Sequence, residues 1–276
     1  MKKKYDDLLT VTCVDKVLNQ EENRKQSGLK SRELIENASI PVIKMVFASA
    51  NGDLEVDFTT NNYHGVRNTR LLNRFRNTKK PYSKIDARVV QLNALIKQWA
   101  KKNKLHGGKD RRFNSYSPVI LVVYYLQKGV SPAILPNLNE EEELRTELGE
   151  IENTDDYVRK LNYDSSKQRM SLPELLIGFM AFYAVFDFSE RLIDITRNNS
   201  LNRNVFKPVG YRGGRIQLLI ACPAYGNWPT RSVSTECYED FRSALDTFNE
   251  FVWKQLDGIE DSNEQFELFS KLIGIG

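Results

Sequence analysis

Two apolar runs joined by a tight turn place the strongest constraint on how this chain can fold. The runs "IPVIKMVFA" and "LEVDFTT" are rich in β-branched residues, and the "NGD" between them is typical of a hairpin turn. In the second run Leu54, Val56 and Phe58 share one face of a strand, so Asp57 points the other way. We therefore expect an antiparallel strand pair, with Asp57 either solvated or one member of a metal-binding set.

After this pair, the regular apolar patterns are mostly of helical spacing. The segments "SPVILVVYYLQ", with Asn114 or Ser115 as its candidate cap, "SLPELLIGFMAFYAVFDF" and "STECYEDFRSALDTFNEFVWKQL" are all expected to be helices. The segment "DARVVQLNALIKQWAKKN" has an apolar helix face made of Val89, Leu92, Ile96 and Trp99. The short runs "RLIDIT" and "RIQLLIACP" are candidates to pair as strands, and "YDDLLTVTCVDKVLNQ" predicts a strand or helix start that runs into a helix before Gly28.

These patterns predict an α+β fold in which a partial sheet packs on a larger, mostly helical domain. We expect residues 1–85 to form the sheet-containing part, residues 86–256 the helical part and residues 257–276 a C-terminal tail. Two or three strands with one helix bury little area, so the first part is expected to lean on the helices.

Charge is distributed very unevenly along the chain. Between Arg67 and Arg112 there are fifteen Lys and Arg residues against two acids, whereas nine acids and one Arg lie between Glu140 and Asp156. The acidic block is typical of a solvated face. The basic block is expected to attract phosphates, either of a nucleic-acid backbone or of a nucleotide.

The remaining composition excludes several classes of protein. Three cysteines without CxxC spacing do not indicate a disulfide framework or a zinc site, and His64 and His106 lie in no recognisable motif. No apolar run is long enough to span a membrane, and the N-terminal residues have no apolar signal core. We expect no membrane association and a cytoplasmic location, with the nucleus as the alternative.

Several polar residues are candidates for a nucleotide site. Lys97 and Lys101 stand one helical turn apart, on a stripe that Ala94 and Val90 continue backwards, where they could hold phosphates or simply be exposed. Ser115 and Tyr116 precede a helix, where N–H groups and a hydroxyl can meet an anion and an aromatic ring can stack on a base. The polar residues Asn62 and Thr69 follow Asp57 in the segment that joins the sheet to the helices.

In this order, the motifs resemble those of the cytoplasmic-type poly(A) polymerases and terminal uridylyltransferases, within the DNA polymerase beta-like nucleotidyltransferase superfamily. The resemblance runs from about residue 40 to residue 251 and is carried by "IPVIKM", "VDFTTNN", "NTRLL", "DARVVQLNALIKQWAKK", "NSYSPVILVVYYLQ", "PAILPNL" and "SLPELLIGFMAFYAVFDF". The last of these is similar to the PAP-associated domain of the family, at about residues 170–225 here.

The resemblance implies a role for each candidate. Asp57 would be the third catalytic carboxylate and a metal ligand, and Asn62 and Thr69 would contact the sugar and base edge of the incoming nucleotide. Lys97 and Lys101, helped by Ser115, would hold its triphosphate, and Tyr116 would stack on its base. The implied cofactor is a two-metal site for Mg or Mn, and the implied substrates are ATP or UTP and an RNA 3′ end.

One part of the family pattern is not found. The family has a Gly-Ser turn followed by two carboxylates spaced D-x-D upstream of the third Asp, and the roughly fifty residues before Asp57 contain neither. The adjacent acids Asp6 and Asp7 would point to opposite faces of a strand and could not both replace the pair. We therefore expect two alternatives: a nucleotidyltransferase that is inactive as this isolated chain, or a non-catalytic homologue that binds RNA, nucleotide or a partner protein.

Substrate selection is left open by the sequence. The stretch "CPAYGNWPTRSV" lacks the histidine that some uridylyl-preferring members carry, which argues against a strict uracil preference. No RNA-recognition module is present in the chain, so an RNA-binding protein partner or the basic surface would have to choose the RNA.

Overall fold

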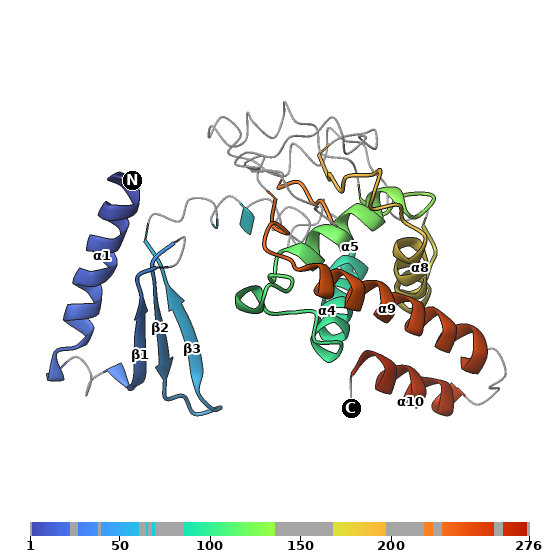
Figure 1. The fold of residues 1–276 in the computed structure, drawn as a ribbon. Helices are drawn as coiled ribbons and strands as arrows, with labels where there is room; N and C mark the ends of the chain where they lie inside the picture. The colour runs from blue at the N-terminus through green and yellow to red at the C-terminus, as the bar shows by residue number, and fades with distance from the viewer. Residues whose placement is uncertain are drawn as a thin grey trace. The chain divides into compact units, whose positions relative to one another are not determined.

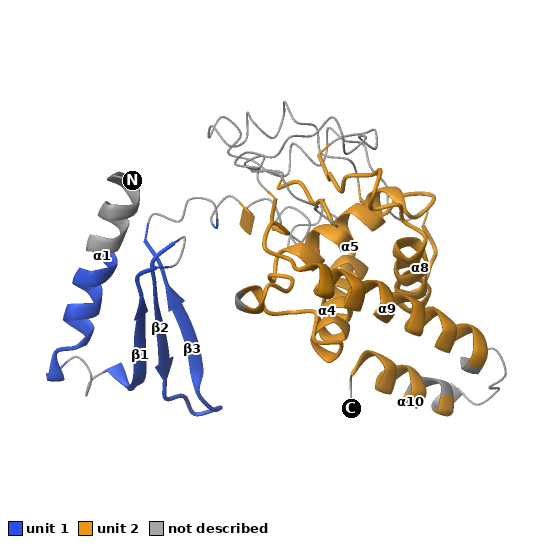
Figure 2. Cartoon of the chain, in the orientation of Figure 1, with its two compact units in different colours: residues 1–67 blue, residues 68–276 orange. Residues whose placement is uncertain are grey.

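The computed structural model describes residues 2–22, 27–37, 40–60, 65, 68–69, 86–135, 168–196, 218–222, 228–256 and 262–274. The chain divides into two compact units, Met1–Arg67 and Asn68–Gly276 (Figure 2). None of the helices in the described ranges is both long and apolar enough to cross a membrane.

The described residues of unit 1 contain a three-stranded antiparallel sheet and the helix α1. Its elements are α1 (Lys2–Leu18), β1 (Leu29–Ile35), β2 (Val42–Phe47) and β3 (Leu54–Phe58), with the strand order β1-β2-β3 (Figure 1). The predicted hairpin of β2 and β3 is confirmed by the pairing of Met45 with Val56. Its turn needs Gly52, whose φ of +108° is a conformation that side chains with a Cβ rarely adopt. The first strand, β1, was not specifically predicted, because "LKSRELI" has no clean alternation.

One face of this sheet carries a small core. Val11 of α1 is buried together with Leu29, Ile43 and Met45 of the strands, and Val56 and Phe58 pack against them. Arg32 forms an ion pair with Asp15 of α1. The helix therefore covers the face that the even-numbered residues of β3 point to, as the alternation of that strand predicts.

Unit 2 is helical. It contains α4 (Ala87–Lys102), α5 (Ser117–Lys128), α8 (Leu172–Ala184), α9 (Thr235–Phe251), which continues into a π-helical turn (Val252–Leu256), and α10 (Ser262–Ile273). The starts of these helices follow from their caps. Ser171 and Glu174 form a reciprocal capping box at α8, and the side chain of Ser234 accepts a hydrogen bond of 3.1 Å from the N–H of Cys237 at α9.

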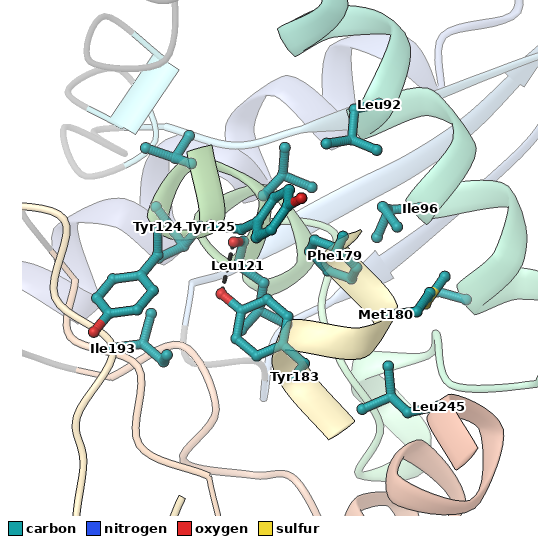
Figure 3. Packing of buried hydrophobic residues seen from close by; sticks show 14 of the residues in the cluster. Leu92, Ile96, Leu121, Tyr124, Tyr125, Phe179, Met180, Tyr183, Ile193 and Leu245 are labelled. Carbon is teal, nitrogen blue, oxygen red and sulfur yellow. Dashed lines mark hydrogen bonds between the residues drawn. The ribbon is translucent and has the colours of Figure 1, made fainter. Parts of the chain in front are cut away.

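The core of unit 2 is built around α5 and α8. The predicted apolar face of α4 is confirmed, since Leu92, Ile96 and Trp99 are at most 2% exposed. Figure 3 shows Leu92 and Ile96 beside the aromatic cluster, in which the Tyr183 hydroxyl donates a hydrogen bond of 2.7 Å to the carbonyl of Leu121. This bond satisfies a polar group that would otherwise be costly to bury.

Two further parts of unit 2 are the pair of short apolar runs and the C-terminal segment. The runs "RLIDIT" and "RIQLLIACP" do pair, and in the part of them that the structure describes the pairing is one parallel bridge between Ile193 and Ile220. The segment expected as a tail contains α10, whose C-terminal end lies against α4: Gln98 donates to the Gly274 carbonyl at 2.7 Å, and Lys102 donates to that of Leu272 at 3.1 Å.

Candidate nucleotide-binding site

Outside its buried face, helix α4 has one side that contacts α10 and another that carries Lys97 and Lys101. Gln98 and Lys102 are used to hold α10. Lys97 and Lys101 share another stripe with Val90, which is 44% exposed, so this stripe lies outside the hydrophobic core. Lys97 is half-buried and Lys101 is exposed. Within the described ranges neither ammonium group forms a hydrogen bond or an ion pair, so both are available to an anion.

Other cations of the basic block have structural partners. Arg88 pairs with Asp86, the cap of α4, and also donates to the carbonyls of Met170 and Gln168 at the entry to α8. Burial opposes ionisation of Asp86, but the hydrogen bonds and charge of Arg88 outweigh it and hold the pKa of the Asp86 carboxyl below its ordinary value. Arg112 pairs with Asp240 of α9 at 3.0 Å. These arginines therefore stabilise the fold and are not free for phosphate.

The start of α5 is fixed by Asn114. Its side-chain oxygen accepts hydrogen bonds from the N–H of Tyr116 at 3.1 Å and from the N–H and hydroxyl of Ser117, both at 2.9 Å. Its amide nitrogen donates to the carbonyl of Pro229 at 3.0 Å. The N-cap position itself is Tyr116, so neither Asn114 nor Ser115 is the N-cap residue that the sequence predicted; Asn114, two residues earlier, nevertheless accepts the N–H groups at the helix start. Ser115 is exposed beside it, so its hydroxyl and backbone are accessible at the helix N-terminus.

Tyr116 is linked to two segments that are distant in sequence. Its ring is partly buried against the core, and its hydroxyl donates to the side-chain oxygen of Asn68 at 3.3 Å. The thiol of Cys222 reaches the same oxygen at 3.6 Å. Thr69, one of the predicted ligands, follows Asn68 and is exposed. The structure thus brings the start of α5 together with residues 68–69 and with Cys222.

Asn68 and Cys222 were not predicted as site residues. Asn68 lies inside the quoted motif "NTRLL", so its position beside Thr69 was an available signal. Cys222 had no such signal, because a single cysteine in an apolar run is usually a core residue. It is indeed 5% exposed, and the described residues contain no disulfide.

Asp57 lies in unit 1, on the face of the sheet opposite to its core. It is exposed, and it stands in register with Lys44 of β2, which in turn stands opposite Glu33 of β1. Its geometry relative to the lysines and Tyr116 of unit 2 therefore stays a prediction, as does the division into three parts. Asn62 lies outside the described residues.

The carboxylates of the described chain do not fit a two-metal centre. No group of three or more His, Cys, Asp or Glu side chains in the described ranges is placed to hold a metal ion. The neighbour of Asp57 across β2 is a lysine, whose charge disfavours a cation there. Asp6 and Asp7 belong to helix α1, so the strand considered for them in the sequence analysis is wrong.

Comparison with known proteins gives these observations a context. Residues 3–77 match the family model described as "Poly(A) RNA polymerase, mitochondrial-like, central palm domain". The poly(A) RNA polymerase gld-2 of Caenorhabditis elegans is 31% identical over 187 residues, which are 63% of this chain and 16% of that protein. The terminal uridylyltransferase cid1 of Schizosaccharomyces pombe is 30% identical over 175 residues, 60% of this chain and 40% of that protein.

The chain is related to poly(A) RNA polymerases and terminal uridylyltransferases. Solved structures agree in fold. A mutant of mtPAP in complex with ATPγS matches with a TM-score of 0.74 at 20% identity, and the match covers 99% of this chain and 55% of that chain. The Cid1 poly(U) polymerase with Mg 3′-dATP bound has a TM-score of 0.65 at 26% identity and covers 87% of this chain and 72% of that one. The resemblance found in the sequence is therefore confirmed, as is the α+β fold with a small sheet and many helices.

The similarity covers only part of these relatives. The matched stretches span 16%, 11% and 13% of three of the gld-2 polymerases of worm and fly and 40% of cid1.

Proposed function

We propose that this chain carries the nucleotide-binding part of an RNA 3′-terminal nucleotidyltransferase, which transfers adenylyl or uridylyl groups from ATP or UTP to an RNA 3′ end. One observation carries the proposal: Lys97 and Lys101, which have no hydrogen-bond or ion-pair partner among the described residues, stand on α4 in a unit that also holds an anchored tyrosine at the start of α5. The relatives named as poly(A) polymerases and uridylyltransferases, and neighbours bound to ATP and UTP analogues, support it.

The residues have distinct roles in this proposal. Lys97 and Lys101 hold the triphosphate, and Ser115, which is exposed just before α5, contributes its hydroxyl. The ring of Tyr116 stacks on the base, which is sequence-tolerant because every base has a π-face. Asn62 and Thr69 contact the sugar and base edge. RNA, an RNA-binding protein partner and a cytoplasmic or nuclear location remain predictions.

A divalent metal such as Mg or Mn belongs to the proposed reaction, in which it would neutralise the triphosphate and align the RNA hydroxyl. Asp57 is the residue of this chain that we propose as a ligand. The carboxylates of the described residues do not complete a metal set around it.

The second candidate function is nucleotide, RNA or protein binding without catalysis, and it follows from the surroundings of Asp57. With Asp57 flanked by Lys44 and no D-x-D pair upstream, the chain would act as a non-catalytic homologue that binds RNA, nucleotide or a partner protein. The two candidates share the nucleotide site of unit 2 and differ in whether transfer takes place.

Nucleotide binding is tested by charge-matched lysine variants. Lys97→Ala and Lys101→Ala are each expected to weaken ATP and UTP binding about 10- to 100-fold, since a hydrogen bond to a charged group contributes about 1.5–3 kcal/mol. The control is Lys102→Ala, which removes the same charge from the same helix but from the side that holds α10. Equal weakening by all three variants in calorimetric titrations would indicate a diffuse charge effect and contradict the assigned site.

Primer extension separates the two candidates. The 276-residue chain is expected not to extend an RNA primer with ATP or UTP in Mg²⁺ or Mn²⁺, because Asp57 alone cannot organise two divalent ions. Addition of a segment with the Gly-Ser and D-x-D pattern should confer extension, and Asp57→Ala should then abolish it. Extension by the chain as it stands, lost on Asp57→Ala, would show that other carboxylates complete the site.

A further inference from the structure

The Tyr116 side chain is held at both of its ends. At the backbone end, Asn114 accepts the Tyr116 N–H at 3.1 Å and is itself tied to the Pro229 carbonyl. At the other end, the phenol hydroxyl donates to the side-chain oxygen of Asn68 at 3.3 Å. A tyrosine side chain has only two torsions to fix, so these two attachments and the partial packing of the ring on the core restrict its plane.

Asn68 is in turn held by Cys222. An amide oxygen has two lone pairs, and here the Tyr116 hydroxyl and the Cys222 thiol, at 3.6 Å, both approach it. The thiol belongs to the segment 218–222, whose Ala221 N–H is bonded to the carbonyl of Ile193 at 2.8 Å. The Asn68 amide is therefore fixed against a part of the backbone that is anchored in the core of unit 2.

We infer that Asn68 and Cys222 are positioning residues that hold the Tyr116 ring in the plane on which a nucleobase stacks. The inference rests on the proposed function, because it takes Tyr116 as the base platform. Stacking depends on the orientation of the two rings, so a platform that is free to tilt binds the base less well. The triphosphate, which the lysines of α4 hold, does not depend on the ring.

This difference between base and phosphate makes the inference testable. The ligands are ATP, UTP and inorganic tripolyphosphate, which has the phosphate charge but no base. Tyr116→Phe keeps the ring but removes its hydroxyl, and Cys222→Ala removes the thiol. Each is expected to weaken ATP and UTP binding about 3- to 10-fold, the range of one lost neutral hydrogen bond, with tripolyphosphate binding unchanged.

Two further variants separate positioning from general destabilisation. Cys222→Ser keeps a donor near Asn68 and is expected to recover most of the affinity lost in Cys222→Ala. Cys237→Ala removes another buried thiol of the same unit, whose contact is the Leu105 carbonyl at 3.9 Å, and should leave all three affinities unchanged. The double variant Tyr116→Phe with Cys222→Ala should bind ATP no more than about twofold weaker than the poorer single variant, because both act through Asn68.

The outcomes distinguish the inference from the function on which it rests. If the unmodified chain binds neither ATP nor tripolyphosphate, the proposed function is overturned, and the inference with it. If it binds ATP, but Tyr116→Phe and Cys222→Ala bind ATP as tightly as the unmodified chain, only the inference is overturned. Equal losses for ATP and tripolyphosphate, or failure of Cys222→Ser to recover affinity, would likewise exclude a role in orienting the ring.

Discussion

Replacement of Asn114 by Ala should destabilise unit 2, because it removes the side chain that holds the start of α5. The Asn114 oxygen accepts three hydrogen bonds, one of them from the hydroxyl of Ser117, whose side chain is completely buried. Loss of a helix cap costs about 0.5–2 kcal/mol, and a buried hydroxyl left without a partner costs about 1–3 kcal/mol. Because these terms overlap, we expect Asn114→Ala to lower the free energy of unfolding by about 2–4 kcal/mol.

Tryptophan fluorescence during urea unfolding measures this change in the right unit. All three tryptophans, Trp99, Trp228 and Trp253, belong to unit 2, and the first two are at least 90% buried. The fluorescence transition therefore reports the unfolding of the helical unit without a contribution from the sheet of unit 1. The midpoint and slope of the transition give the free energy of unfolding.

Two neighbouring variants serve as controls. Asn114→Asp keeps an oxygen that accepts the three hydrogen bonds and loses only the donation to Pro229, so its cost should be about 1 kcal/mol. Ser115→Ala changes an exposed side chain and should stay within about 0.5 kcal/mol of the unmodified chain. If Asn114→Ala costs less than about 0.5 kcal/mol, or if Asn114→Asp costs as much as Asn114→Ala, the oxygen of Asn114 does not hold the start of α5.

The remaining predictions concern acid stability and RNA binding. The pKa of Asp86 is lower in the folded state than in the unfolded state, so its pairing with Arg88 should stabilise the chain above about pH 4, and this stabilisation should be lost as the pH falls further. In Asp86→Asn, the free energy of unfolding should therefore fall less steeply as the pH is lowered below about 4. An unchanged pH dependence in this variant would contradict the prediction. Single-stranded RNA should bind more weakly as salt is raised, with a slope of log affinity against log salt of about −0.7 for each phosphate contact. Salt-independent binding would show that the basic block does not contact the RNA phosphates.

The helices of unit 2 were predictable because their signals are local. Val89, Leu92, Ile96 and Trp99 repeat at helical spacing, and the Ser171-x-x-Glu174 pattern fixes the start of α8. The hairpin was predictable for the same reason, since a tight turn and two alternating runs are read over about twenty residues. By contrast, β1 has a polar and irregular sequence, and its strand conformation depends on pairing with β2.

The contacts that shape the candidate site are not local. Asn68 and Cys222 are separated by more than 150 residues, and no spacing rule links an asparagine in one segment to a thiol in another. That Lys97 and Lys101 share one stripe of α4 was predictable from helical spacing. Which lysines of this helix contact another helix was not. Lys102 is used to hold α10, and only the packing of that helix reveals it.

The residues proposed to hold the triphosphate and stack on the base, and the carboxylate proposed for the transfer reaction, belong to different units. The lysines and the tyrosine proposed to hold the nucleotide belong to unit 2, and the tyrosine hydroxyl donates to Asn68 of the same unit. The carboxylate proposed for the chemistry, Asp57, belongs to unit 1, where it stands in one cross-strand row with Lys44 and Glu33. In this row the ammonium of Lys44 compensates one of the two negative charges, and a divalent ion at Asp57 would require carboxylates beyond the row. A chain with this arrangement is expected to bind nucleotides even if it does not transfer them, because the interactions proposed to hold the ligand do not require the carboxylates that organise the metal.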